Sequence, residues 1–223
     1  MTETPGLTTG DDSELSPEQS LALIGAQRQA TRRALEIDDW RLYGTWGLAW
    51  LIAYGTTYLV FPHASDPDAN TGPAWLVAVV WPVAIGAAMF VTVRHVHSRR
   101  AGVLDGGGTL FGLSYLIGTA AAGVTGSILP RLIEPVDPGL ASIAPSVCIV
   151  LVIGMIYLVS GAFWSDRLQA AVGGWLIVVN ILALLPGTDT YSLGMAVGGG
   201  GGFLVAALLA WRRDRAGEVV ADR

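Results

Sequence analysis

The sequence predicts an all-α membrane protein, a six-transmembrane-helix bundle with an N-terminal cytoplasmic amphipathic helix. First, its 223 residues include six apolar runs of 18 to 21 residues without Asp, Glu, Lys, Arg or His. Each run is long enough to cross a hydrocarbon core of about 30 Å as a helix. Second, only 14% of the residues are charged, against about 25% in a soluble domain. Third, the basic residues, all Arg, gather in alternate loops.

The predicted organisation has four parts, of which a transmembrane domain is the largest. A polar, acidic tail at residues 1–15 is predicted to be disordered, because it has little apolar surface to bury. An amphipathic helix at 16–37, the transmembrane domain at 38–211 and a cytoplasmic tail at 212–223 follow. The predicted spans cover residues 42–61, 74–93, 109–129, 143–163, 168–185 and 191–211.

The predicted N-terminal helix begins with a capping signal. Ser16 can cap, Pro17 suits the first helical position, and Gln19 stands where a capping box places Glu or Gln. Apolar residues then fall roughly on one face, with arginines on another. The helix therefore either packs on the inner end of the bundle or docks on a lipid surface or a partner.

Arginine placement orients the bundle. Arg131 is the only one of the thirteen basic residues that lies in a loop after an odd-numbered span. By the positive-inside rule, the other loops face the cytoplasm, so both termini are expected on the inner side of the cytoplasmic (plasma) membrane.

The acids of the opposite loops are either ordinary polar loop residues or a weak funnel for cations. These acids are Asp66, Asp68, Glu134, Asp137 and Asp189.

A glycine and aromatic signature recurs in the odd-numbered spans. It reads Gly47-Leu48-Ala49-Trp50-Leu51-Ile52 in the first, Gly112-Leu113-Ser114-Tyr115-Leu116-Ile117 in the third and Gly173-Gly174-Trp175-Leu176-Ile177 in the fifth. Each of these spans then ends at a proline. The pattern indicates three tandem helical hairpins, in which the glycine and the aromatic residue set hairpin packing.

Small residues mark two of the predicted spans. In the sixth, Gly194, Gly198 and Gly202 recur every four residues, and 198–202 is an unbroken glycine run. This run is either a tight helix crossing or a locally unwound segment that binds a ligand. The third span has a small face that includes Gly112 and Thr119. We expect the third and sixth spans to make close contacts, within the bundle or across a homo-oligomer.

The spans contain few groups that could carry chemistry. Asn180 is the most polar residue inside them and needs a partner, either another helix or a ligand. The absence of an intramembrane acid or base argues against proton or sodium coupling. No catalytic motif is present, and arginines around His95 and His97 would repel a metal ion. We therefore expect no enzyme activity, no cofactor and no metal, and the net charge of −5 does not suggest nucleic acid.

Residues 16–54 carry a resemblance to a known group of proteins. With Gln27-Arg28-Gln29 before a first span that reads Tyr43-Gly44-Thr45-Trp46-Gly47-Leu48-Ala49-Trp50-Leu51, the chain resembles small uncharacterised actinobacterial six-span integral membrane proteins. That resemblance implies no known activity. In architecture alone the chain is similar to ABC-2-type exporter permeases. It departs from them in its short 94–108 loop and in the 186–190 loop, which has no room for a re-entrant segment.

Two functions remain open on the sequence. The first is an interaction or regulatory module that engages a cytoplasmic protein partner or anionic lipid. The second is a permease component for a neutral or lipophilic compound, driven by a separate ATPase subunit. The glycine-rich sixth span and the six-span plan favour the permease. The cytoplasmic features favour the interaction module, whose candidate docking residues are Arg28, Arg32, Arg33, Arg94, Arg99 and Arg100.

Overall fold

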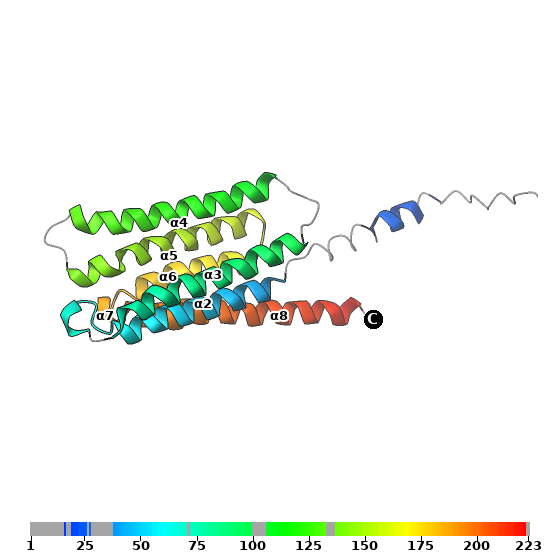
Figure 1. Ribbon diagram of the computed structural model, residues 1–223. Coiled ribbons are helices and arrows are strands. Elements are labelled where there is room, and N and C mark those ends of the chain that lie inside the picture. Colours follow the sequence, from blue (N-terminus) through cyan, green and yellow to red (C-terminus); the bar gives the residue numbers. More distant parts are fainter. Residues whose placement is uncertain are drawn as a thin grey trace, which may run out of the picture. The chain divides into compact units, whose positions relative to one another are not determined.

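A computed structural model describes residues 16, 19–25, 27, 38–70, 72–99, 106–132 and 137–221. The chain divides into two compact units, Met1–Ile37 and Asp38–Arg223. All regular secondary structure in the described residues is helical, which confirms the all-α prediction (Figure 1).

The first unit contains the predicted capping box. The Gln19 amide donates to the Ser16 hydroxyl at 3.2 Å, and the Ser16 amide donates to the Gln19 side-chain oxygen at 3.0 Å. This reciprocal pair satisfies two backbone donors at the start of a helix. Residues 19–25 and 27 are helical. The rest of the predicted helix, with Arg28, Arg32 and Arg33, lies outside the described residues.

The second unit contains the longer helices of the described residues. Its elements are α2 (Asp39–Val60), the short 3-10 helix η1 (Pro67–Ala69), α3 (Ala74–Arg99), α4 (Gly106–Leu132), α5 (Pro138–Phe163), α6 (Arg167–Leu182), α7 (Thr188–Gly194), the π-helix η2 (Met195–Gly200) and α8 (Gly201–Ala221). Each predicted span coincides with one helix, except the sixth, which α7, η2 and α8 form together. Pro82 lies inside α3 without ending it.

Local chemistry explains several helix ends. The Asp137 carboxylate accepts from the Leu140 amide at 2.8 Å and Pro138 occupies the first turn of α5, as an N-terminus favours. Asp166 caps α6 by accepting from the Leu168 and Gln169 amides. Asp38 also stands at an N-cap position, but its side chain makes no capping hydrogen bond. Its carboxylate is used in the contact described below.

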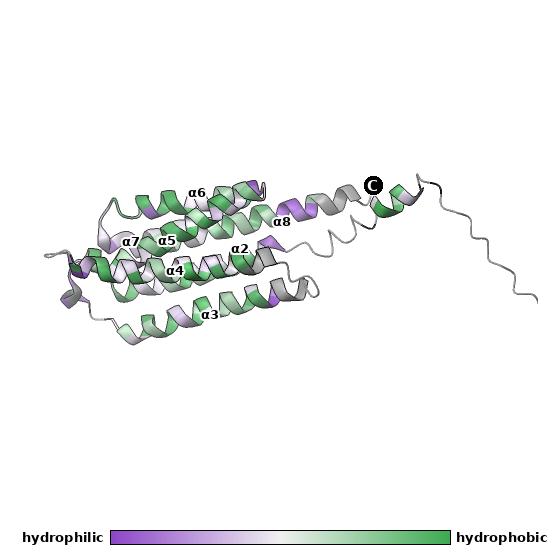
Figure 2. Ribbon diagram, turned by 90° about the horizontal axis from the view of Figure 1, so that it is seen from above, coloured by the Kyte–Doolittle hydropathy of each residue, from purple (hydrophilic) through white to green (hydrophobic). Residues whose placement is uncertain are grey.

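Four helical stretches in the described residues are long and apolar enough to cross a membrane. They are Ala74–His95, Gly112–Leu132, Pro138–Phe163 and Thr188–Ala216. The apolar stretch of α6, Arg167–Leu182, is shorter, and α2 is less apolar because Tyr, Trp and Thr occupy many of its positions. Large apolar side chains are exposed on the outer surfaces, for example Leu59, which is 79% exposed, and Phe163, which is 81% exposed. The ribbon coloured by hydropathy shows apolar residues along the long helices (Figure 2). Lipid is the solvent that favours such a surface, so we place the chain in a membrane.

The helices of this unit pack in the spatial order α3, α2, α8, α6, α5, α4. Among the described residues, α3 packs extensively only on α2, and α4 only on α5. The expected contact between the third and sixth spans inside the bundle is therefore wrong, because α8 packs between α2 and α6. In the first predicted hairpin, α2 packs toward the core and α3 lies outside it. In the second predicted hairpin the order is reversed, because α5 packs toward the core and α4 lies outside it. The three hairpins are thus not equivalently placed.

Aromatic rings fill the middle of this arrangement. Phe203 of α8 contacts Trp50 of α2 edge-on, with ring centroids 5.2 Å apart, and also lies against Tyr43 and Tyr157. Such pairs contribute about 0.5–1.5 kcal/mol each beyond the burial of their area. Trp50, in the first copy of the recurring signature, thus packs on α8, a helix outside its own hairpin.

Candidate functional site

The glycine-rich helix is packed closely on two sides. Gly194 lies opposite Ala183, the residue that follows α6, and Gly198 and Gly202 lie opposite Val179 and Trp175 of α6. This matches the predicted ridge of small residues spaced four apart. On α2, a Cβ atom added to Gly200 would lie 2.8 Å from the Leu51 nitrogen, a backbone atom that cannot rotate away.

The glycine run remains helical throughout. Met195–Gly200 forms a π-helix that continues directly into α8. A π-bulge shifts the hydrogen-bond ladder and leaves carbonyl groups for other partners. The indole N–H of Trp175 donates to the Gly198 carbonyl at 2.8 Å. The run is therefore helical and closely packed, as the alternative of a tight helix crossing predicts.

Asn180 finds its partners on other helices. Its amide donates to the Val147 carbonyl of α5 at 3.0 Å, and its carbonyl accepts from the Tyr191 hydroxyl of α7 at 2.8 Å. Asn180 is 3% exposed and Tyr191 is 1% exposed. Close by, the Tyr54 hydroxyl of α2 bonds to the Ser146 hydroxyl of α5. These bonds join four helices, and they supply Asn180 with the interhelical partners that one of the two alternatives predicts.

Three polar contacts join α2 to α3. The Trp46 indole donates to the Thr92 hydroxyl at 3.0 Å, and the Trp81 indole donates to the Thr57 hydroxyl at 2.8 Å. Each threonine hydroxyl also donates to a carbonyl one turn back in its own helix, so it both accepts and donates a hydrogen bond. The third contact, at the start of α2, involves charge.

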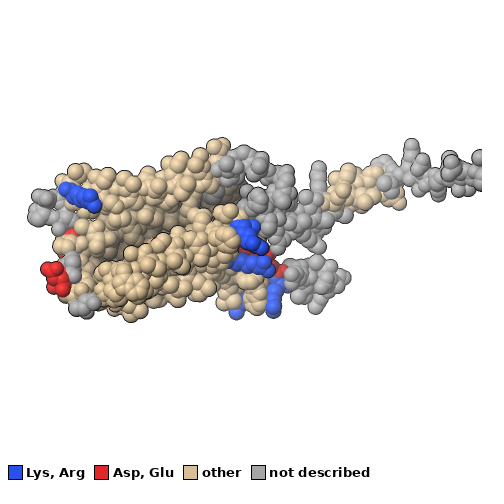
Figure 3. Space-filling model, in the orientation of Figure 1, with Lys and Arg blue, Asp and Glu red and all other residues tan. Residues whose placement is uncertain are grey.

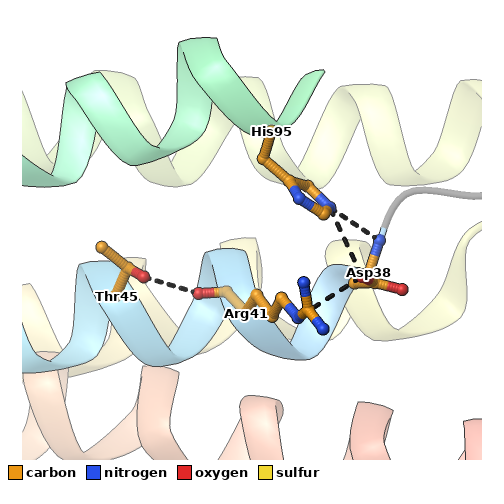
Figure 4. A network of polar contacts seen from close by, with 4 residues as sticks. All are labelled: Asp38, Arg41, Thr45 and His95. Atoms are coloured by element: carbon orange, nitrogen blue, oxygen red, sulfur yellow. Dashed lines mark hydrogen bonds and ion pairs between the residues drawn. The ribbon is translucent and has the colours of Figure 1, made fainter. Parts of the chain in front are cut away.

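Asp38 ties the start of α2 to the end of α3 (Figure 4). Its backbone N–H donates to His95 Nε2 at 3.1 Å, and its carboxylate Oδ2 lies 3.8 Å from the same nitrogen. The same Oδ2 is 3.4 Å from Arg41 Nε. The His95 side chain is 11% exposed and the Arg41 side chain 54%. This contact, which we call the α2 root, holds the residue at which the N-terminal unit joins the bundle.

Charged side chains are separated between the two ends of the bundle. Figure 3 shows basic side chains gathered mainly at the end where α8 finishes. Exposed residues at the ends of α2, α3, α6 and α8 supply them, whereas Arg131 at the end of α4 is the only described arginine at the opposite end. The arginines of the basic end are Arg41, Arg94, Arg167, Arg212, Arg213 and Arg215.

Of the predicted docking residues, the structure describes only some. Arg94 is exposed near the end of α3. Arg99 is the last residue of α3, but its side chain is not among those described, and Arg100 lies outside the described residues. In the parts of the chain that the structure describes, no cluster of His, Cys, Asp or Glu is arranged to hold a metal ion.

The candidates on α4 lie apart from those on α8. Gly112 is exposed, and a Cβ atom there would meet nothing within 4 Å. Thr119 lines a groove of about 470 Å³ on the flank of α4, together with Gly123, Ser127, Arg131 and Ile149 of α5. The close approach of α4 to α5 occurs instead at Gly126, where a Cβ atom would lie 2.6 Å from Pro145 Cα.

No protein-family profile, curated protein or solved structure matches this sequence.

Proposed function

We propose that all six helical segments span the cytoplasmic membrane and that both termini lie in the cytoplasm. Two features support adding α2 and α6 to the four strongly apolar stretches. Each packs between other spanning helices, α2 between α3 and α8, and α6 between α5 and α8. Six crossings also put the basic end of the bundle on the cytoplasmic side, as the positive-inside rule requires.

We further propose that the protein is a non-enzymatic interaction or regulatory module that recruits a cytoplasmic protein through residues 16–37. The α2 root carries this proposal, because it fixes Asp38, the first residue after that segment, to α3. If a partner bound to the helix at 16–37 displaced it, the displacement would therefore be transmitted through Asp38 to α2 and α3. The exposed arginines around this point suit an acidic partner surface.

Deletion of residues 1–36 tests this role. We expect the deletion, and the triple change of Arg28, Arg32 and Arg33 to Gln, to reduce recovery of the cytoplasmic partner at least about tenfold, as expected when about 1.4 kcal/mol of binding is lost. Recovery is measured by quantitative mass spectrometry after in-cell crosslinking and purification in mild detergent. A matched control changes Arg212 and Arg213 to Gln. Equal recovery of every protein by wild type and both N-terminal variants would contradict the proposal.

A permease component for a neutral or lipophilic compound is the alternative function. The glycine run no longer supports it, since its backbone is packed and helical. The six-helix plan remains its support. An ATPase subunit that co-purifies equally with wild type and with the deletion variant would favour the permease over the interaction module.

A further inference from the structure

The groove on α4 is a continuous strip along one side of that helix. Thr119, Gly123 and Ser127 follow one another at four-residue spacing, and Arg131 lies one turn further on, at the end of the groove. Its volume is about 470 Å³, and it is a shallow groove that is open along one side. Ile149 of α5 contributes the wall opposite α4.

The inner surface of the groove is suited to hydrocarbon despite its two hydroxyl groups. The Thr119 hydroxyl donates to the Tyr115 carbonyl and the Ser127 hydroxyl donates to the Gly123 carbonyl, each at 2.8 Å. Their protons are thus already used within α4, so an apolar ligand leaves no donor unsatisfied. Ala120, Val124 and Ile128 supply the rest of the α4 lining.

The groove opens sideways into the lipid. Among the described residues, α4 packs extensively on α5 alone, and Val124 in the groove is 59% exposed. Twelve residues separate Thr119 from Arg131, which is about 18 Å of helix at 1.5 Å per residue. One leaflet of the hydrocarbon core is about 15 Å thick. The groove therefore has the length of an acyl chain that descends from the membrane surface on the Arg131 side.

The charge at the end of the groove is complementary to a phosphate. Arg131 is exposed and makes no ion pair with any described residue. The described acids Asp66, Asp68, Asp137 and Asp189 lie at the same end of the bundle. Arg131 is the only arginine among the described residues at this end, so it is the described guanidinium that an anionic headgroup could reach there. A guanidinium binds phosphate through paired, charge-assisted hydrogen bonds.

We propose that this groove is a binding site for one anionic phospholipid, with its phosphate on Arg131 and one acyl chain between α4 and Ile149. The proposal rests on the placement of α4 in the membrane and not on the proposed cytoplasmic role. The lipid would cover the exposed flank of α4, which packs extensively on α5 alone among the described residues. A second copy of the chain seated on the same flank is the competing occupant.

Native mass spectrometry in mild detergent, with added phosphatidylglycerol, tests the site. We expect wild type to hold one phosphatidylglycerol molecule more tightly than phosphatidylcholine, in which the choline cation offsets the charge of the phosphate. Arg131→Gln should weaken phosphatidylglycerol binding about tenfold, and Arg131→Lys less than that. Ala120→Trp should also weaken it about tenfold by filling the groove. The matched control is Ala121→Trp, since the neighbouring Ala121 is equally exposed but outside the groove.

The outcomes separate the occupants. Loss of the bound lipid in Arg131→Gln and Ala120→Trp, with retention in Ala121→Trp, supports the proposal. Equal lipid retention by all variants would show only general solvation of the bundle and would overturn it. A dimer that Ala120→Trp dissociates, with no lipid bound to the wild-type chain, would assign the groove to a second copy and would also overturn it.

Discussion

Gly173→Ala should lower the free energy of unfolding by about 3 kcal/mol, the upper part of the range for overpacked sites. A Cβ atom at this position would overlap the Leu158 amide nitrogen and lie 2.6 Å from the Gly154 carbonyl oxygen. Both are backbone atoms of α5, so neither can rotate away. The methyl group can be accommodated only if α5 and α6 move apart, which loosens contacts along both helices.

The neighbouring Gly174 provides the control. A Cβ atom there would meet nothing within 4 Å, so Gly174→Ala should leave stability unchanged or raise it by up to about 1 kcal/mol through helix propensity. Both variants are compared with wild type by reversible unfolding in mixed detergent micelles. If the two substitutions had the same effect, α5 and α6 would not approach each other at Gly173.

Asn180→Ala should destabilise the bundle by about 2 kcal/mol. The change removes the hydrogen bonds to Val147 and Tyr191 and leaves the buried Tyr191 hydroxyl without its acceptor. An unsatisfied buried group costs about 1–3 kcal/mol. Tyr191→Phe removes one bond without leaving a new cavity, so its effect should be nearer the average of about 0.6 kcal/mol measured between membrane helices.

Ser114→Ala is the control for Asn180. The Ser114 hydroxyl is exposed and donates only to the Leu110 carbonyl of its own helix, so its removal should change stability little. The free energies of unfolding of Asn180→Ala, Tyr191→Phe and the variant with both changes, compared with wild type, complete a double-mutant cycle. Additive effects of Asn180→Ala and Tyr191→Phe would mean that these side chains are not coupled, and the four-helix cluster would lose its support.

Much of the fold was predictable from apolar run length. The six runs without ionisable residues anticipate the helices because each must satisfy its own backbone hydrogen bonds inside lipid. The capping box at Ser16 was likewise predictable, as was the need of the buried Asn180 amide for a partner, although not which partner it would be. Spacing also identified Gly194, Gly198 and Gly202 as a packing ridge.

Helix neighbours were not predictable, because the spacing of small residues shows that a helix comes close but not which helix. Gly112 and Gly126 look alike in the sequence, yet only Gly126 meets α5. The Trp46–Thr92 and Trp81–Thr57 hydrogen bonds were not predicted either, because the sequence does not show that α2 and α3 align these residues. An indole N–H and a Thr hydroxyl inside apolar helices were the available signal. The α2 root depends on Asp38 and His95, which are far apart in the chain and carry no motif. Arg131 was noticed only as an exception to the charge rule.

Cysteine accessibility measures the six-span topology most directly. In a Cys148→Ala background, single cysteines replace Asp68 after α2, Ser165 between α5 and α6, Pro186 after α6, and Ala216 in the C-terminal part of α8. A membrane-impermeant maleimide is applied to intact cells and then to opened cells. Six spans predict that the cysteines at 68 and 186 react in intact cells, and those at 165 and 216 only after opening. If positions 165 and 186 reacted alike, α6 would not span the membrane and the six-span assignment would be contradicted.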